Sequence, residues 1–213
     1  MMMVEYLKDP AAIYALSFET VRREAALDRF PNDVAEVVVR LIHACGMPAI
    51  ADDIAFTPGA VVAGRKALAS GAPILVDANM VGAGIIRRHL NGNPVICTLD
   101  DDGVADDAKH DATTRSAAAV DRWAPRLDGA VAVIGNAPTA LFRLLELIED
   151  GAPKPAVVLG FPVGFVGAAE SKQALVDESP IIPHAALLGR RGGSAIAAAA
   201  VNAIARVAAR IDQ

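Results

Sequence analysis

Apolar residues recur every three or four positions through the first fifty residues, which is the period of an amphipathic helix. The first helix is predicted to begin at Asp9-Pro10, a capping residue followed by proline, and to end near Ala26. A second is predicted from Asp33, where Glu36 completes a capping-box spacing, to Gly46. Two helices therefore precede the rest of the fold.

After Pro48 the pattern changes to short apolar runs that alternate with longer amphipathic stretches. The apolar runs predict buried strands at 74–77, 95–99, 130–134, 156–159 and 185–188. The amphipathic stretches predict helices at 60–69, 80–90, 113–124, 139–149, 168–176 and 194–209. This alternation is typical of an α/β fold with a doubly wound, mostly parallel sheet and helices on both faces. We expect a single domain over residues 1–213, with an N-terminal helical segment.

His43 lies in the last turn of the second predicted helix. The apolar stripe of that helix is expected to contain Val34, Val37, Val38, Leu41 and Cys45. A helical wheel places His43 on the opposite face, beside Glu36, Val39 and Arg40. The helix dipole favours the imidazolium form and Arg40 opposes it, a setting that suits a general acid. An exposed helix-end histidine without a role is the alternative that spacing leaves open.

Three loops that follow predicted strands are candidates for ligand contact, because ligands bind at the carboxyl ends of parallel strands. After Ile134, a Gly-Asn turn leaves backbone N–H groups facing that edge, and Asn136 is expected either to cap the next helix or to contact ligand. The loop at 160–172 carries Phe161 and Phe165, which either line a pocket for a large flat ligand or lie in the core.

Paired cations mark the third loop. Arg190 and Arg191 lie beside glycines at a helix start, which suits a carboxylate or phosphate, although a surface salt bridge is the alternative. Arg115 with Ser116 forms a similar candidate at another helix start. The loose segment at 100–111 begins with an acidic run at 100–107, which lacks the spacing of a calcium loop and is expected to be a solvated loop, so no metal site is predicted.

Composition narrows the class of protein. Net charge is −5, which makes nucleic acid an unexpected partner. The most apolar stretch, 195–205, is too short to span a membrane and is followed by Arg206 and Arg210. The first ten residues do not form a signal peptide, and the two cysteines, Cys45 and Cys97, are far apart. We therefore expect a cytoplasmic protein with reduced thiols.

Several long blocks resemble the precorrin-8X methylmutase family, also called precorrin isomerase. They are IYALSF (13–18), VRLIHACGMP (39–48), GAPILVDANMV (71–81), VICTL (95–99), TRSAAA (114–119), AVIGNAPTALFRLLE (132–146), GAPKPAVVLGFPVGFVGAAESK (151–172) and GRRGGSAIAAAAVNA (189–203). Together they cover nearly the whole chain. One departure precedes the TRS block, where the family often has Gly-Asn and this chain has Asp111-Ala112-Thr113.

The resemblance implies an α/β homodimer that acts in cobalamin biosynthesis. Its reaction moves a methyl group from C11 to C12 of a polycarboxylate tetrapyrrole, precorrin-8X, and gives hydrogenobyrinate without a metal or redox cofactor. The family's catalytic histidine falls on His43. The resemblance and the loop chemistry together identify the candidate substrate contacts Ser17, Arg40, Arg115, Ser116, Asn136, Lys172, Arg190 and Arg191.

Three alternatives stay open at this point. The chain could be a cobalt-precorrin-8 methylmutase, although its IHACG and TRSAAA blocks are nearer to the metal-free branch. It could be a carrier that binds a tetrapyrrole without changing it. The fold alone also admits a phosphate-binding sugar or nucleotide enzyme, but fold is a poor guide to function.

Overall fold

A computed structural model describes residues 6–178 and 182–209. The two ends of the predicted domain, residues 1 and 213, lie outside these ranges, and so does Arg210. The helices are α1 (Pro10–Glu24), α2 (Asn32–Cys45), α3 (Ala60–Ala69), α4 (Asn79–Gly84), α5 (Val104–His110), α6 (Arg115–Asp121), α7 (Pro138–Glu149), α8 (Ala168–Glu178) and α9 (Ser194–Ala209). Short 3-10 helices are η1 (Pro48–Asp53), η2 (Arg87–His89) and η3 (Ala124–Arg126). The strands are β1 (Ile54–Phe56), β2 (Ile74–Val76), β3 (Val95–Ile96), β4 (Val131–Ile134), β5 (Val157–Gly160) and β6 (His184–Leu187).

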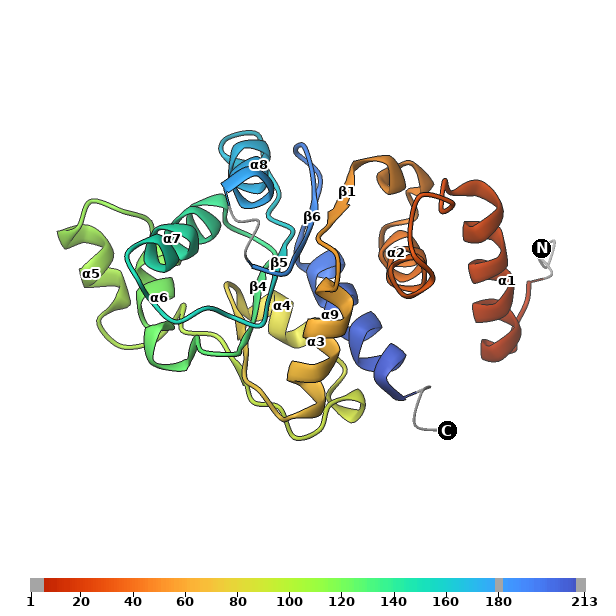
Figure 1. Ribbon diagram of the computed structural model, residues 1–213, viewed down its shortest axis with the longest axis horizontal. Helices are drawn as coiled ribbons and strands as arrows, with labels where there is room; N and C mark the ends of the chain where they lie inside the picture. The colour runs from red at the N-terminus through yellow and green to blue at the C-terminus, as the bar shows by residue number, and fades with distance from the viewer. Residues whose placement is uncertain (1–5, 179–181, 210–213) are drawn as a thin grey trace, which may run out of the picture.

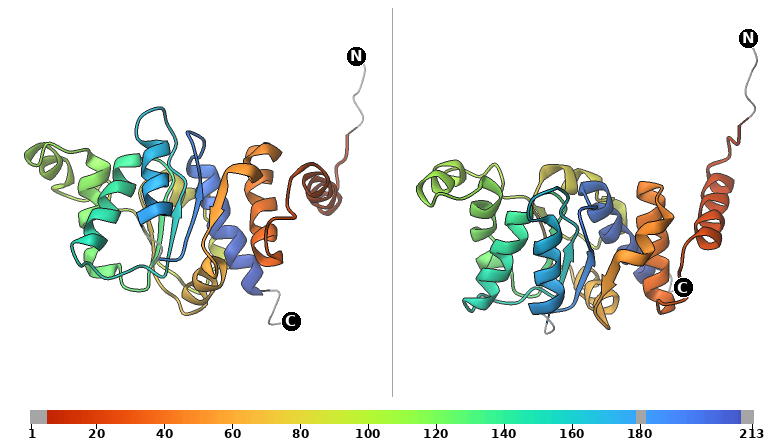
Figure 2. Two further views of the ribbon diagram at one scale, coloured as in Figure 1. Left: turned by 45° about the horizontal axis from the view of Figure 1, so that its top comes forward. Right: turned by 90° about the horizontal axis from the view of Figure 1, so that it is seen from above.

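The strands form one sheet in the order β1-β6-β5-β4-β2-β3. Figure 1 labels the first four of them in this order. Every neighbouring pair is parallel except β1 with β6, which is antiparallel at the sheet edge. Helices cover both faces, with α3, α4 and α9 on one and α6, α7 and α8 on the other (Figures 1 and 2). The predicted α/β fold with a mostly parallel sheet is confirmed.

Alternate residues of each strand enter two separate cores, which is why whole strands are apolar. In β2, Ile74 and Val76 pack toward α3 and α9, whereas Leu75 packs toward α6 and α7. In β5, Val158 faces the second core and its neighbours face the first. Because neither face of these strands meets water, they read as continuous apolar runs.

The N-terminal helices extend the structure beyond the sheet edge. Helix α2 packs against α9 on one side and α1 on the other, and α1 lies farthest out (Figure 2). Because α2 has partners on both sides, Val39 is only 1% exposed, and its predicted place on a polar face is wrong. The spacing of Tyr14, Phe18, Val21 and Ala25 predicts an apolar stripe on α1, which is confirmed only in part, since Val21 is buried while Tyr14 is exposed.

Two of the predicted helix caps are confirmed and one is wrong. Asp9 accepts a hydrogen bond from the Ala12 N–H at 2.7 Å, and Gly46 ends α2 in the left-handed conformation, as predicted. The predicted capping box is wrong, because α2 begins at Asn32 without a side-chain cap. Glu36 instead forms an ion pair with Arg22 of α1, so a side chain assigned to a local cap joins two helices.

Several predicted elements differ from the observed ones for identifiable reasons. The predicted helix at 80–90 is divided into α4, which ends at Gly84, and η2. Between them Asn202 of α9 donates to the Gly84 carbonyl at 2.9 Å and accepts from the Ile86 N–H at 2.8 Å, in place of helical partners. The predicted loop at 100–111 contains α5, because Val104 and Ala108, four residues apart, are buried together. Strand β1 was not predicted, since three residues are too short to show a period.

Candidate functional site

His43 lies where α1 crosses α2. Its Nδ1 is 2.7 Å from the hydroxyl oxygen of Ser17, which belongs to α1. The ring of Tyr14 has its centroid 5.4 Å from the imidazole centroid, and Phe18 meets the same ring edge-on at 5.2 Å. The imidazole itself is exposed. The histidine is therefore oriented by three α1 side chains and remains open to a ligand.

Arg40 joins this cluster from one turn earlier in α2. Its guanidinium carbon lies 4.8 Å from the centroid of the Phe18 ring, in cation–π geometry. Phe18 therefore contacts both His43 and Arg40. The structure thus brings together three of the predicted site residues, Ser17, Arg40 and His43, at the α1–α2 contact.

Asp77, which directly follows β2, organises the loop after β4. Asp77 is only 2% exposed, and the sequence does not predict it as a site residue. The carboxylate accepts three hydrogen bonds, from the backbone N–H groups of Gly135 at 2.7 Å, Asn136 at 2.9 Å and Ala137 at 2.8 Å. Burial raises the pKa of the Asp77 carboxyl, and the three backbone bonds counter that rise.

The N–H groups predicted to face a ligand are thus bound to the protein's own carboxylate. An internal anion occupies the position that a phosphate would take at the start of α7. Asn136 does not cap the helix, because the N-cap residue is Ala137 and it has no side-chain cap bond. The side chain of Asn136 is exposed at the carboxyl edge of the sheet, where contact with a ligand stays a prediction.

Arg115 lies at the start of α6, and Asp100 fixes its position. The guanidinium donates to one Asp100 oxygen at 3.1 Å, while Asn79 at the start of α4 donates to the other at 2.6 Å. Asp100 therefore links two helix starts at the carboxyl edge of the sheet, although sequence reasoning placed it in a solvated run. The neighbouring Ser116 is half-buried.

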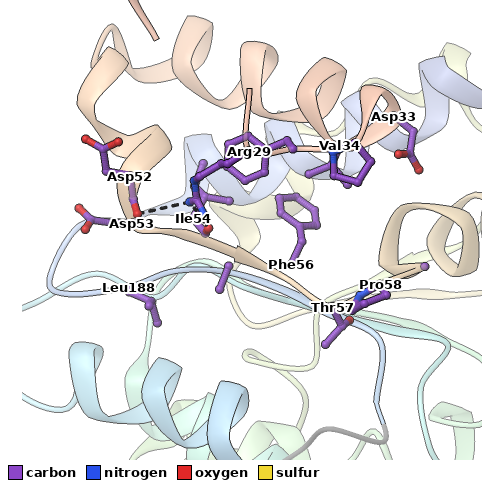
Figure 3. A pocket seen from close by; sticks show the side chains of 14 residues that line it. Arg29, Asp33, Val34, Asp52, Asp53, Ile54, Phe56, Thr57, Pro58 and Leu188 are labelled. Carbon is purple, nitrogen blue, oxygen red and sulfur yellow. Dashed lines mark hydrogen bonds between the residues drawn. The ribbon is translucent and has the colours of Figure 1, made fainter. Parts of the chain in front are cut away.

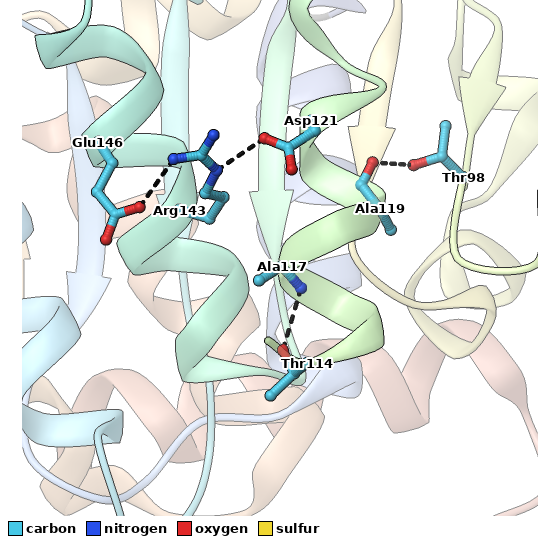
Figure 4. Close-up of polar contacts among 7 residues, drawn as sticks. All are labelled: Thr98, Thr114, Ala117, Ala119, Asp121, Arg143 and Glu146. Carbon is cyan, nitrogen blue, oxygen red and sulfur yellow. Dashed lines mark hydrogen bonds and ion pairs between the residues drawn. The ribbon is translucent and has the colours of Figure 1, made fainter. Parts of the chain in front are cut away.

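The helix that carries Arg115 is held by side-chain contacts (Figure 4). Thr114 accepts a hydrogen bond from the Ala117 N–H at 3.2 Å and so caps α6. Arg143 of α7 bridges Glu146 and Asp121, and these hydrogen bonds raise the pKa of Arg143 (Figure 4). The Thr114 hydroxyl also lies 2.7 Å from that of Thr139 in α7, so α6 is held to α7 at both ends.

The loops after β5 and β6 separate the two candidate phenylalanines and the two candidate arginines. Phe161 is fully buried, whereas Phe165 is 85% exposed. The Arg190 guanidinium carbon lies 5.5 Å from the centroid of the Phe165 ring, and Arg191 forms an ion pair with Asp53. Phe165 and Arg190 are thus presented together at the surface, while Phe161 belongs to the core.

Lys172 in α8, which is expected to contact substrate, lies in the interior of the protein. Its side chain is fully buried, and its ammonium donates to the carbonyls of Pro162 at 3.0 Å and Arg191 at 2.6 Å. Burial lowers the pKa of Lys172 to about 8. In this structure the ammonium holds two loops rather than facing solvent.

One pocket of about 420 Å³ lies beside η1 and β1 (Figure 3). Arg29 reaches into it and donates to the backbone carbonyls of Ala51 and Ile54, each at 2.6 Å. The residues that line this pocket include none of the predicted site residues. Its connection to the site is Asp53, the partner of Arg191.

The chemistry of the described ranges includes few other candidates. Within residues 6–178 and 182–209 no three His, Cys, Asp or Glu side chains are grouped to hold a metal ion. Over the same ranges, no helix has the length and apolar character needed to cross a membrane. Cys45 and Cys97 are both free thiols, and burial raises the pKa of Cys97.

Comparison with known proteins adds a consistent set of similarities. Residues 12–207 match the precorrin-8X methylmutase family. A precorrin-8X methylmutase from Pseudomonas aeruginosa is 56% identical over 95% of this chain and 98% of its own. A cobalt-precorrin-8 methylmutase from Priestia megaterium is 36% identical over 93% and 88%. A crystal structure of the Thermus thermophilus precorrin-8X methylmutase matches with a TM-score of 0.85 and 42% identity, over 94% of this chain and 97% of that one.

Proposed function

The chain belongs to the precorrin-8X methylmutase family, and on that premise we propose that it converts precorrin-8X to hydrogenobyrinate in cobalamin biosynthesis with His43 as the general acid. The enzyme is an isomerase of the intramolecular-transferase class. The observation that carries the role of His43 is its exposed imidazole, oriented through Nδ1 by Ser17. The methyl group leaves C11 and bonds to C12, so substrate and product have the same composition.

The hydrogen bond to Ser17 supports proton donation from the other ring nitrogen. When His43 is protonated, its Nδ1–H donates to the Ser17 oxygen and its Nε2–H is directed away from that bond. When His43 is neutral, a hydroxyl that donates to Nδ1 keeps the remaining hydrogen on Nε2. In the proposed mechanism Nε2–H donates to the tetrapyrrole during methyl migration, and any proton transferred returns, because an isomerisation consumes none.

The substrate's acetate and propionate groups require cations around the site. We assign Arg40 to the His43 end of the ligand and Arg115 and Arg190 to the edge of the sheet. Guanidinium groups suit these contacts because they bind carboxylates in a bidentate way. The exposed side chain of Asn136 and the hydroxyl of Ser116 are proposed as neutral contacts. Phe165, beside Arg190, offers an apolar ring to the macrocycle.

We propose the metal-free substrate rather than the cobalt-containing one. Identity to the Pseudomonas aeruginosa precorrin-8X enzyme is 56%, against 36% to the Priestia megaterium cobalt-precorrin-8 enzyme. The two substrates share the same carboxylate rim, so the arginines do not distinguish them. Relative kcat/KM for precorrin-8X and cobalt-precorrin-8 tests this choice, and a preference for the cobalt form would overturn it.

A cytoplasmic homodimer is the proposed assembly, with the His43 cluster near the subunit contact. Ile13, Tyr14 and Leu16 of α1 are 43%, 50% and 55% exposed, although α1 contributes Tyr14 to the His43 cluster. A second copy that covers this face would remove apolar surface from water beside the imidazole. Sedimentation should give twice the chain mass, and Leu16→Glu should shift it toward the monomer; a wild-type monomer would contradict the proposal.

The phosphate-enzyme alternative rests on the fold alone. At the loop after β4, Asp77 already binds the backbone N–H groups that a phosphate would need. We expect inorganic phosphate and ATP at millimolar concentration to leave Tm unchanged, since a ligand of the folded state would raise it. A clear rise in Tm would restore this alternative.

A single-turnover experiment distinguishes catalysis from carriage. Enzyme in excess is mixed with precorrin-8X, and the absorption spectrum is followed in time. Catalysis predicts a binding spectrum followed by conversion to that of hydrogenobyrinate, whereas a carrier would stop at the first spectrum. Extraction of the pigment after acid quenching identifies which compound is bound, and recovery of only precorrin-8X would overturn the proposed function.

A further inference from the structure

The loops 161–167 and 188–193, called here the paired loops, are joined along their backbones. The Gly193 N–H donates to the Phe161 carbonyl at 2.8 Å, and the Gly164 N–H donates to the Arg190 carbonyl at 3.2 Å. At Gly192 an added Cβ would lie 2.4 Å from the carbonyl oxygens of both Phe161 and Pro162. The paired loops therefore approach more closely than a side chain at residue 192 would allow.

Lys172 adds a contact to each of the paired loops. Its ammonium donates to Pro162 O at 3.0 Å in the first loop and to Arg191 O at 2.6 Å in the second. The side chain is fully buried, and both of these bonds end on uncharged carbonyls. Burying an ammonium is costly, and filling the same volume does not require one. The specific contribution of the ammonium is the connection between the loops.

That connection determines where one exposed cation lies. Arg191 is held at its carbonyl by Lys172 and at its guanidinium by Asp53. The preceding residue, Arg190, is exposed, and its guanidinium lies over the Phe165 ring of the opposite loop. Arg190 and Phe165 come from different loops, so their pairing depends on the contact between the paired loops.

We propose that Lys172 is a positioning residue that holds the paired loops together so that Arg190 and Phe165 bind one polycarboxylate ligand as a unit. The inference rests on the proposed function for the identity of that ligand. It gives Lys172 a role through the backbone, in place of direct contact with a substrate carboxylate. Because His43 lies on a different element, substrate binding should depend on Lys172 more than the chemical step does.

The first test compares Lys172→Met with Lys154→Met, which removes an exposed lysine on a loop before β5. With precorrin-8X as substrate, Lys172→Met should raise KM at least about tenfold while kcat falls less than about threefold. Lys154→Met should change neither. A tenfold loss in kcat with unchanged KM, or no change in either constant, would overturn the proposal.

A double-mutant cycle separates positioning from general loss of structure. If Lys172 acts through Arg190, the KM of Lys172→Met with Arg190→Gln should match that of Arg190→Gln alone. Additive effects would show that Lys172 acts elsewhere. If Lys172→Met does not fold, Gly192→Ala separates the loops from the other side and should raise KM by a similar factor; an unchanged KM in that variant would overturn the proposal.

The outcomes also distinguish this inference from the proposed function. Wild-type turnover of precorrin-8X with an unaffected Lys172→Met variant would reject the role of Lys172 and leave the enzyme activity intact. Binding without turnover by the wild-type protein would reject the activity, and the cycle would then be measured on the Kd for precorrin-8X.

Discussion

The hydroxyl oxygen of Ser17 lies 2.7 Å from Nδ1 of His43, across the contact between α1 and α2 and 26 residues away in the chain. Nothing in the spacing of α2 alone indicates that bond. Because of this bond, the exposed imidazole at the end of α2 has one ring nitrogen hydrogen-bonded and a defined orientation. The proposed catalytic role depends on this orientation as much as on the residue itself.

Removing the imidazole should therefore harm turnover more than removing the hydroxyl. We expect His43→Ala to lower kcat by at least about 100-fold, and Ser17→Ala by about tenfold, because the second variant retains the acid but not its orientation. His110→Ala removes an exposed histidine of α5 and should have no effect. Single-turnover absorbance with precorrin-8X measures all three, and wild-type turnover by His43→Ala would refute the assignment.

Asp77 should contribute strongly to stability. Asp77→Asn keeps the shape of the side chain but turns one acceptor into an N–H donor that faces backbone N–H groups. We expect the free energy of unfolding to fall by about 2–4 kcal/mol, measured by urea denaturation. Asp128→Asn, at an exposed position, should change it by less than about 0.5 kcal/mol. Equal effects of both substitutions would show that the three bonds contribute little.

Two glycines of the same region should differ sharply in their tolerance of alanine. At Gly135 an added Cβ would be 2.7 Å from the side chains of both Ala197 and Val81, so Gly135→Ala should lower the free energy of unfolding by about 1–3 kcal/mol. At Gly82, in α4, the nearest atoms are at 3.6 Å, and alanine should be neutral or stabilising by about 1 kcal/mol. Thermal unfolding of both variants checks the contrast, which a stable Gly135→Ala would contradict.

Lys172 predicts a particular dependence of stability on pH. Burial lowers its pKa in the folded protein to about 8, from an ordinary value of 10.5. Between these values the unfolded chain holds more protons, so the contribution of Lys172 to stability rises with pH. The difference in free energy of unfolding between wild type and Lys172→Met should therefore increase from pH 8 to pH 10, by at most about 1.4 kcal/mol per pH unit, and stay level below pH 7. A difference that falls over this range would show that folding does not lower the pKa of Lys172.

Ala112 should be improved by glycine. It has a φ of 49°, in the left-handed region that an alanine side chain disfavours, in the loop where the chain departs from the family's Gly-Asn. We expect Ala112→Gly to raise the free energy of unfolding by up to about 1 kcal/mol. Ala105→Gly in the neighbouring α5 should lower it by a similar amount, because there the backbone is helical. Calorimetry of both variants measures these changes. A lower free energy of unfolding for Ala112→Gly would count against this loop conformation.

Much of the fold could be predicted because it depends on local periodicity. The strands around Leu75 and Val158 are buried on both faces, so they are apolar at every position, and α9 was predicted with the bounds that it has. The exposure of His43 also followed from a helical wheel. The resemblance to the methylmutases, now confirmed as family membership, comes from blocks of consecutive residues and needs no structure.

Only the tertiary structure decided which polar groups meet. A helical wheel shows which side of a helix is apolar but not how many partners that helix has. Val39 is buried because α1 and α9 lie on either side of α2, and the wheel cannot predict this. Asp77 and Lys172 bind backbone groups, and backbone groups are the same at every residue. Contacts of that kind leave no pattern in a sequence, because they are set by how distant segments approach one another.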